Sequence, residues 1–261
     1  MIQVDQLSVF KGQKCLLDQV SLSTQTGQKL AILGANGAGK STLLKCLAGE
    51  ETGYSGEIQF GQRSLPSIQP AERARCLAVM PQQATLAFPF RVAQVVALGR
   101  TPWQDEEKTQ DWQEQAMALT DSVHLANRVF TDLSGGEQQR VQLARVLVQL
   151  WHRLKTESVL YEPAALLLDE CTSALDPAHQ HAIMAATEHF ASAGVAVIAV
   201  MHDTALAASW ADRILMLANG RVLAEGGSEL LADPTLLVKA YQLPPELANR
   251  YAVTNEHWLR D

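Results

Sequence analysis

The chain has 261 residues, of which 47% are hydrophobic and 19% charged, and its formal net charge at pH 7 is -7. This balance is typical of one large globular domain over residues 1–261 whose core needs no metal or disulfide, and the four scattered cysteines form no CxxC pair. The acidic charge argues against a nucleic-acid partner, and no apolar run approaches the ~20 residues that cross a bilayer.

The first predicted elements are short strands. Residues 2–10 and 57–60 are expected to be strands that end at Gly12 and Gly61, because glycine interrupts extended runs. The apolar segment 29–33 is expected to be a strand that leads directly into a glycine-rich loop. After that loop, apolar residues recur at helical spacing, which predicts a helix containing Leu43, Leu44, Leu47 and Ala48.

Later in the chain, residues 166–168 and 195–201 are continuous apolar runs. Such runs are expected of strands that are buried on both faces of a parallel sheet. Asn219-Gly220 lies between apolar residues within 215–223, which predicts a hairpin.

Two stretches are predicted to be helical. Residues 84–150 are rich in Gln, Ala, Leu and charge, and we expect them to form a helical subdomain. The tail, 228–261, is expected to contain short helices. Ser228 is expected to cap a helix over residues 229–232, which Pro234 then interrupts.

Residues 34–41 read GANGAGKS, between a predicted strand and a predicted helix. Glycines allow successive backbone N–H groups to point inward around phosphate oxygens, at the positive end of the helix dipole. In this motif the lysine reaches the β and γ phosphates and the serine hydroxyl binds Mg²⁺. A glycine-rich turn that matches by chance is the alternative. The expected nucleotide contacts are Gly34, Asn36, Gly37, Gly39, Lys40, Ser41 and Thr42.

An acidic pair follows the strand predicted at 166–168. Asp169 would lie at the carboxyl edge of the sheet, where open α/β sheets bind ligands, and would bind Mg²⁺. Glu170 is placed to orient or deprotonate a water molecule. The alternative is a solvated strand terminus without a function.

Ser134 and Glu137 have capping-box spacing at the start of a predicted helix. A capped helix alone does not explain Gly135 and Gly136 between them, because each glycine costs about 1 kcal/mol relative to alanine in a helix. Two glycines are consistent with a phosphate group that approaches this helix start closely.

The segment Leu133–Arg140, LSGGEQQR, lies between the phosphate loop and Asp169, and it resembles the signature of the ATP-binding subunits of ABC transporters. The resemblance covers residues 2–227. It implies an α/β fold: a P-loop NTPase core with a parallel sheet, an N-terminal antiparallel β-subdomain and an inserted helical subdomain. It also implies a homodimer that works with two copies of a transmembrane permease.

The same resemblance assigns roles to further residues. Gln82 matches the glutamine of the Q-loop, which senses the membrane partner and the catalytic magnesium. Asp176 closes the D-loop at the dimer interface, and His202 matches the switch histidine at the γ-phosphate. Glu170 matches the catalytic glutamate. In this family, each ATP is held between the phosphate loop of one copy and the signature motif of the other, which here comprises Ser134, Gly135 and Gly136.

Two features indicate the cargo. The segments 88–92 and 96–100 resemble ATPases of importers for iron chelates, haem and vitamin B12. The longer stretch between Arg140 and Asp169, with its surplus at 151–157, resembles bacterial haemin importer ATPases. We therefore expect haemin uptake at the cytoplasmic face of the bacterial inner membrane, served indirectly by a periplasmic haem-binding protein. A siderophore or vitamin B12 is the alternative cargo.

Direct haem binding is not expected, and Trp151 and His152 are interpreted as packing or surface residues. The chain departs from the family pattern at Cys171, where proline is usual, and before Gly12, where Lys11 replaces the aromatic residue that stacks on adenine. Phe10, one position earlier, is either that stacking residue or part of the core. A small-molecule kinase and an ABC ATPase unconnected to transport remain alternative functions.

Overall fold

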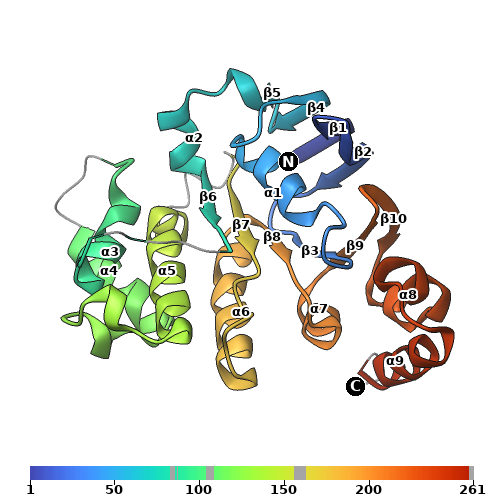
Figure 1. Cartoon of the computed structure of the whole chain (residues 1–261). Coiled ribbons are helices and arrows are strands. Elements are labelled where there is room, and N and C mark those ends of the chain that lie inside the picture. Colours follow the sequence, from blue (N-terminus) through green and yellow to red (C-terminus); the bar gives the residue numbers. More distant parts are fainter. Residues whose placement is uncertain (83–85, 87, 104–108, 156–162, 259–261) are drawn as a thin grey trace. The chain divides into compact units, whose positions relative to one another are not determined.

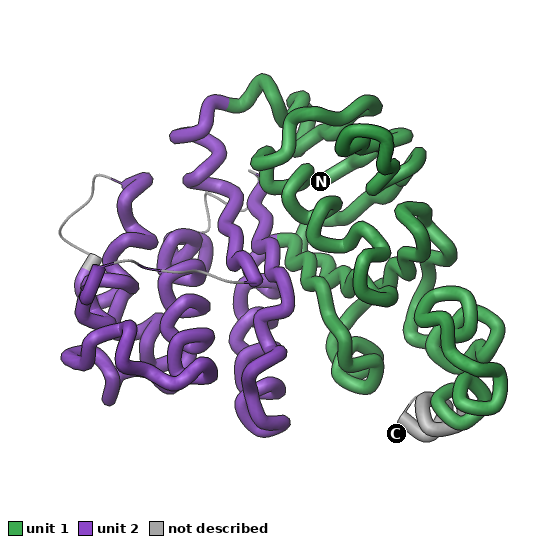
Figure 2. The backbone as a smooth tube through the Cα atoms, in the orientation of Figure 1, with its two compact units in different colours: residues 1–68, 196–261 green, residues 69–195 purple. Residues whose placement is uncertain are grey.

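A computed structural model describes residues 1–82, 86, 88–103, 109–155 and 163–258. The chain divides into two compact units (Figure 2). Unit 1 contains residues 1–68 and 196–261, and unit 2 contains residues 69–195.

Strands and helices alternate through most of the chain (Figure 1). The strands are β1 (Ile2–Lys11), β2 (Lys14–Thr24), β3 (Lys29–Leu33), β4 (Tyr54–Phe60), β5 (Arg63–Ser64), β6 (Leu77–Met80), β7 (Ala165–Asp169), β8 (Ala196–Val200), β9 (Arg213–Ala218) and β10 (Arg221–Gly226). The α-helices are α1 (Lys40–Ala48), α2 (Pro70–Cys76), α3 (Val92–Ala97), α4 (Thr109–Leu119), α5 (Gly135–Gln149), α6 (Pro177–Ser192), α7 (Thr204–Trp210), α8 (Pro234–Tyr241) and α9 (Pro245–Trp258). Short 3₁₀ helices are η1 (Leu65–Ser67), η2 (Leu98–Arg100), η3 (Val123–Leu125), η4 (Phe130–Asp132), η5 (Trp151–Leu154) and η7 (Ser228–Ala232).

Unit 1 contains two kinds of strand pairing. An antiparallel sheet has the order β2-β1-β4-β5, in agreement with the expected N-terminal β-subdomain. In a second group, β3 runs parallel to β8 on one side and to β9 on the other. All residues of β8 are buried, and so are residues 30–33 of β3, as expected of strands that are covered on both faces.

The predicted hairpin is present between β9 and β10. Asn219 and Gly220 both adopt left-handed backbone angles, with φ values of 50° and 77°. Positive φ at both central residues is what a two-residue type I′ hairpin requires, and Asn-Gly supplies it with little steric cost.

In unit 2, β6 and β7 are parallel neighbours, with Met80 opposite Leu168. Helices α3, α4 and α5 pack together and account for the helical character of residues 92–149. They form part of the larger compact unit 69–195, so a separate subdomain over 84–150 stays a prediction.

The tail differs from the sequence prediction in its capping. Gly227, not Ser228, is the N-cap residue of η7, and the Glu229 carboxylate accepts a hydrogen bond from the Gly227 N–H at 2.9 Å. Pro234 begins α8 instead of only ending the preceding helix, because the Asp233 carboxylate caps the new helix and proline suits its first turn.

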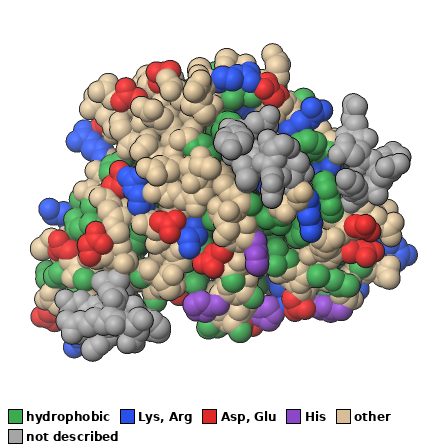
Figure 3. Space-filling view, turned by 180° about the vertical axis from the view of Figure 1, so that it is seen from behind, with side chains coloured by type: hydrophobic (Ala, Val, Ile, Leu, Met, Phe, Trp, Pro, Cys, Tyr) green, Lys and Arg blue, Asp and Glu red, His purple; other side chains and the backbone are tan. Residues whose placement is uncertain are grey.

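Within the residues that the structure describes, none of the helices combines the length and the apolar character that a bilayer span requires. Figure 3 shows acidic and basic side chains interspersed over the face that it displays, with no extended basic patch among the side chains coloured there. This distribution is consistent with the acidic net charge of the chain.

Candidate active site

The phosphate loop connects β3 to α1 in unit 1. Gly34, Gly37 and Gly39 have φ values of 145°, 79° and 103°, which side chains rarely permit. Space is also restricted at two of them. A Cβ atom at Gly34 would lie 2.2 Å from the Leu217 carbonyl oxygen, and one at Gly39 would lie 2.7 Å from Cδ2 of Leu17. The sequence requirement for glycine is therefore both conformational and steric.

Lys40 is buried at the start of α1, and its Nζ donates hydrogen bonds to the carbonyl oxygens of Gly34 at 2.8 Å and Ala35 at 3.0 Å. The loop thus carries a fixed positive charge in its interior. Gly39 is the N-cap of α1 and has no side chain to satisfy the first N–H groups of the helix. Ser41 and Thr42 follow in the first turn. These features suit an anion at the helix N-terminus.

Two backbone hydrogen bonds hold the loop against more distant parts of unit 1. The Ala35 N–H donates to the Ala240 carbonyl oxygen of α8 at 3.0 Å, and the Gly220 N–H donates to the Ala38 carbonyl oxygen at 3.0 Å. Next to Ala240, burial raises the pKa of Tyr241 to about 12. The contact between the tail and the phosphate loop was not predictable from sequence, because a backbone contact leaves no residue-type signature.

His202 leaves the same sheet edge as the phosphate loop. In the parallel pair β3–β8, Ile32 lies opposite Val200, and the Met201 N–H donates to the Ile32 carbonyl oxygen at 3.1 Å. Gly34 follows Ile32 by two residues, and His202 follows Val200 by two residues. Both residues therefore lie just beyond the same end of this strand pair. Asp203, the next residue, caps α7: its carboxylate accepts hydrogen bonds from the backbone N–H groups of Ala205 at 2.9 Å and Leu206 at 3.0 Å. The exposed His202 is therefore followed directly by a capped helix.

The equivalent arrangement in unit 2 brings Gln82 and Glu170 together. Both residues lie two positions beyond the paired residues Met80 and Leu168, and Nε2 of Gln82 donates to Oε2 of Glu170 at 2.5 Å. Asp169, at the end of β7, is buried. Glu170 itself has a φ of 54°, a left-handed conformation that costs a non-glycine residue ~1–3 kcal/mol and is often found at functional sites.

The signature helix begins with the predicted capping box. The Ser134 N–H donates to Oε2 of Glu137 at 2.7 Å, and the Glu137 N–H donates to Oγ of Ser134 at 3.4 Å. The hydrogen bonds from Ser134 hold the pKa of Glu137 below its usual value. The N-terminus of α5 is thus capped while the first-turn glycines stay accessible.

The D-loop lies against those glycines. A Cβ at Gly136 would lie 3.2 Å from Cδ2 of Leu175, whereas one at Gly135 would meet only Ala174, at 3.8 Å. Close packing within the chain therefore explains part of the requirement at Gly136, and Gly135 keeps room for an external group. Together with Asp176, these residues line a pocket of about 510 Å³. The pKa of Asp176 is lowered, mainly by hydrogen bonds from the His179 backbone and side chain.

The predicted site residues thus form two groups. The first lies in unit 1 and comprises Gly34, Asn36, Gly37, Gly39, Lys40, Ser41, Thr42 and His202. The second lies in unit 2 and comprises Gln82, Ser134, Gly135, Gly136, Asp169, Glu170 and Asp176.

The structure shows the environments of Phe10 and of the pair Trp151 and His152, which the sequence left open. Phe10 is 61% exposed at the end of β1, so the core alternative is wrong, and stacking of Phe10 on adenine stays a prediction. Trp151 and His152 are buried. Trp151 packs edge-on against Phe190, with 5.8 Å between ring centroids, and the His152 ring packs at a tilt of 54° against Trp103, with 4.3 Å between centroids. Both are packing residues, as interpreted. The last residues of the predicted insert, 156 and 157, lie outside the described residues.

Comparison with known proteins identifies the family. A sequence model of the ABC transporter family matches residues 17–173, which include the phosphate loop, Gln82, the signature motif and Glu170. The chain belongs to the ABC transporter family. Since the matched segment holds the nucleotide motifs, the chain is an ABC-type ATPase that uses ATP.

Two relatives and one solved structure illustrate the similarity. The hemin import ATP-binding protein HmuV of Gloeobacter violaceus is 43% identical over 93% of this chain and 88% of its own length. The protein of the same name from Pseudomonas aeruginosa is 43% identical over 93% of both chains. An ATP-binding cassette solved as a dimer in a post-hydrolysis state, with ADP and Pi bound, matches with a TM-score of 0.73 at 22% identity, over 87% of this chain and 99% of that one. This structure supports the cassette fold.

Proposed function

We propose that this ABC ATPase energises haemin uptake across the bacterial inner membrane, from its cytoplasmic face. The haemin assignment rests on the similarity to hemin import ATP-binding proteins over nearly the full length of both chains. Cargo specificity of an importer resides in other polypeptides, so this chain supplies the energy and not the haem site.

The ATP site is proposed to form between two copies of the chain. The phosphate loop of one copy would bind the phosphates, and Ser134, Gly135 and Gly136 of the other would cover the γ-phosphate. The positive interior of the phosphate loop and the accessible start of α5 support this division of roles. Nucleotide would then hold the dimer closed, and hydrolysis would let it open, a switch that depends on γ-phosphate contacts.

Within each site, Glu170 is proposed to polarise the attacking water. Its hydrogen bond with Gln82 fixes the carboxylate and gives Gln82 a way to respond to a partner that moves the segment after β6. His202 would contact the γ-phosphate from the edge of β8. These groups act by orientation and by electrostatic stabilisation, which dominate phosphoryl transfer.

The donor set also suits Mg²⁺. Ser41, Gln82 and Asp169 offer a hydroxyl, an amide and a carboxylate oxygen, which are the hard ligands that Mg²⁺ prefers. The described residues contain no group of three or more His, Cys, Asp or Glu side chains arranged for a metal. Mg²⁺ commonly takes one or two carboxylates together with substrate phosphates, whose charge it would neutralise here.

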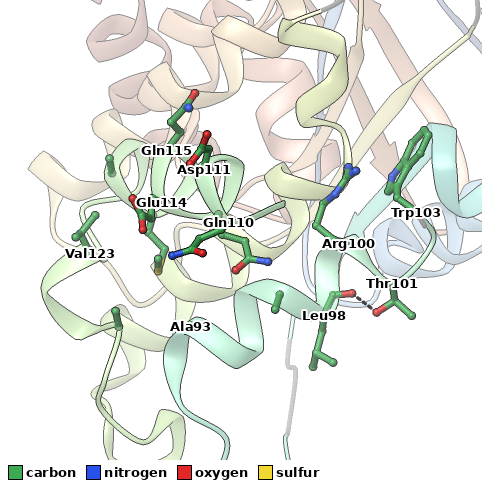
Figure 4. Close-up of a pocket in the computed structure, with 15 residues that line it drawn as sticks. Ala93, Leu98, Arg100, Thr101, Trp103, Gln110, Asp111, Glu114, Gln115 and Val123 are labelled. Carbon is green, nitrogen blue, oxygen red and sulfur yellow. Dashed lines mark hydrogen bonds between the residues drawn. The ribbon is translucent and has the colours of Figure 1, made fainter. Parts of the chain in front are cut away.

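A groove in unit 2 is a suitable contact surface for the transmembrane permease. It has a volume of about 1240 Å³ and is formed by α3, by η2 with the residues that follow it, by α4, and by η3 with Ala126 (Figure 4). Leu98 and Val123, which line it, are 41% and 49% exposed, while Asp111 and Glu114 add charge. We propose that a cytoplasmic segment of each of two permease copies binds in this groove.

Reconstitution of the full transporter tests the cargo. The chain, its permease and the periplasmic binding protein would be placed in liposomes, and ATP hydrolysis measured with haem-loaded and empty binding protein. We expect stimulation by the haem-loaded protein. Stimulation by a siderophore or cobalamin system instead would overturn the haemin assignment, and failure to co-purify with any permease would favour an ATPase unconnected to transport. Phosphorylation of a small acceptor, without release of phosphate to water, would indicate a kinase.

A further inference from the structure

One side chain connects the signature helix with the backbone of Glu170. Nε2 of Gln139, on the second turn of α5, donates to Oγ of Ser173 at 3.2 Å and lies 3.5 Å from the Glu170 carbonyl oxygen. Its Oε1 accepts from the Ala174 N–H at 3.3 Å. Gln139 therefore uses both ends of its amide on the turn that follows the proposed catalytic glutamate.

That turn carries conformational strain. Glu170 has left-handed backbone angles, which persist only where the surroundings determine them. Its carbonyl oxygen accepts from the Ser173 N–H at 3.3 Å and from Oγ of Ser173 at 3.1 Å, and the amide of Gln139 is the third donor. Of these donors, only Gln139 comes from another secondary-structure element.

A second glutamine supports the same turn from the opposite end. Nε2 of Gln180, on α6, donates to the carbonyl oxygens of Thr172 and Leu175, each at 3.1 Å. The turn is therefore held between α5 and α6, and Gln139 is the member of the pair that reaches Glu170.

We propose that Gln139 is a positioning residue that holds the backbone of Glu170 and links it to the signature helix. The proposal rests on the role proposed above for Glu170. In the two-copy arrangement, the start of α5 faces the nucleotide of the partner, whereas Glu170 acts on the nucleotide of its own copy. Gln139 thus joins two ATP sites through about one helical turn and one hydrogen-bonded loop. A change at either site would reach the other through this side chain.

The chain offers a matched control on the same helix. Nε2 of Gln149, near the end of α5, donates to the carbonyl oxygens of Ala74 at 2.5 Å and Leu77 at 3.1 Å. It makes the same kind of contact as Gln139 but does not reach the turn after Glu170. Loss of its donors tests whether any weakening of α5 packing changes catalysis.

The experiment compares Gln139→Glu and Gln149→Glu in the full chain. Each change keeps the size of the side chain but removes its N–H donors. We measure kcat and KM for ATP, the Kd of a fluorescent ATP analogue, and the thermal midpoint. For Gln139→Glu we expect kcat to fall about tenfold or more with Kd changed less than about twofold, because a misplaced catalytic group slows chemistry without weakening binding. For Gln149→Glu we expect a lower thermal midpoint and little change in kcat.

A double-mutant cycle with Ser173→Ala provides the readout that a general structural role would not give. Since Ser173 and Gln139 share the Glu170 carbonyl oxygen, their effects on kcat should be clearly less than multiplicative. Multiplicative effects, equal losses of kcat in the Gln139 and Gln149 variants, or normal kcat in Gln139→Glu would each overturn the inference. Absence of ATP hydrolysis by the unaltered chain would instead refute the proposed function.

Discussion

The two buried thiols, Cys46 and Cys171, make the stability of the fold depend on pH in the alkaline range. Burial, with a smaller contribution from Glu51, raises the pKa of Cys46 from 9.0 to about 12, and burial likewise raises that of Cys171 to about 12, with Asp169 adding to the effect. Above pH 9 the unfolded chain loses these protons while the folded chain keeps them. The free energy of unfolding therefore falls as pH rises from about 9 to 12, and the contribution is fully present below pH 9.

The magnitude follows from the size of the pKa shifts. Between pH 8 and pH 10, each thiol lowers the free energy of unfolding by about 1.4 kcal/mol, or about 2.7 kcal/mol for the two. The assay is urea unfolding followed by tryptophan fluorescence at pH 8, 9 and 10. Other groups titrate in this range, so the decisive quantity is the difference between the unaltered chain and a Cys46→Ala/Cys171→Ala variant. Cys15→Ala, which removes an exposed thiol, is the control.

We expect the pH dependence of the double variant to be shallower by about 2–3 kcal/mol across this range, and that of Cys15→Ala to match the unaltered chain. If the double variant and the unaltered chain lost stability in parallel, within about 0.5 kcal/mol, the thiols would not be protonated and buried as the structure indicates.

Three further substitutions test the site. Lys40→Ala removes the charge inside the phosphate loop and should abolish ATP binding or turnover, so near-normal hydrolysis by this variant would contradict the loop assignment. Glu170→Gln should still bind ATP but hydrolyse it ~10²–10⁴ times more slowly, and gel filtration with ATP should show a stable dimer; a monomer only would count against the sandwich. Gly34→Ala should destabilise the fold by about 2–5 kcal/mol, from left-handed strain plus a clash with the Leu217 carbonyl; calorimetry showing an unchanged thermal midpoint would argue against this loop geometry.

Local patterns explain why much of the fold was predictable from sequence. The strand 29–33 was predicted with the bounds that the structure has, and the hairpin at Asn219-Gly220 and the capping box at Ser134 and Glu137 were also confirmed. Each of these depends on residues that are neighbours in the chain. The prediction was wrong at Ser228, because the neighbouring Gly227 is also a residue type that suits an N-cap and the sequence did not distinguish the two.

Two features of the fold had too weak a pattern in the sequence to be predicted. Strand β2 was not predicted: residues 20–24 alternate regularly between buried and exposed positions, but residues 14–19 do not, and Gln19 has a positive φ of 52°. The exposure of Phe10 was also undecided, because a single aromatic residue at the end of a strand is compatible with either environment.

The sequence by itself determined the chemistry of this ABC ATPase: a phosphate loop, an acidic pair after a buried strand, and a glycine-containing signature. It could do so because each motif is contiguous and needs particular residue types. Only the tertiary structure decided which groups meet across the chain. Strand register brings Gln82 to Glu170, a backbone carbonyl of α8 holds the phosphate loop, and Gln139 reaches the turn after β7. Such contacts depend on packing between distant segments, and no local pattern of residues encodes them.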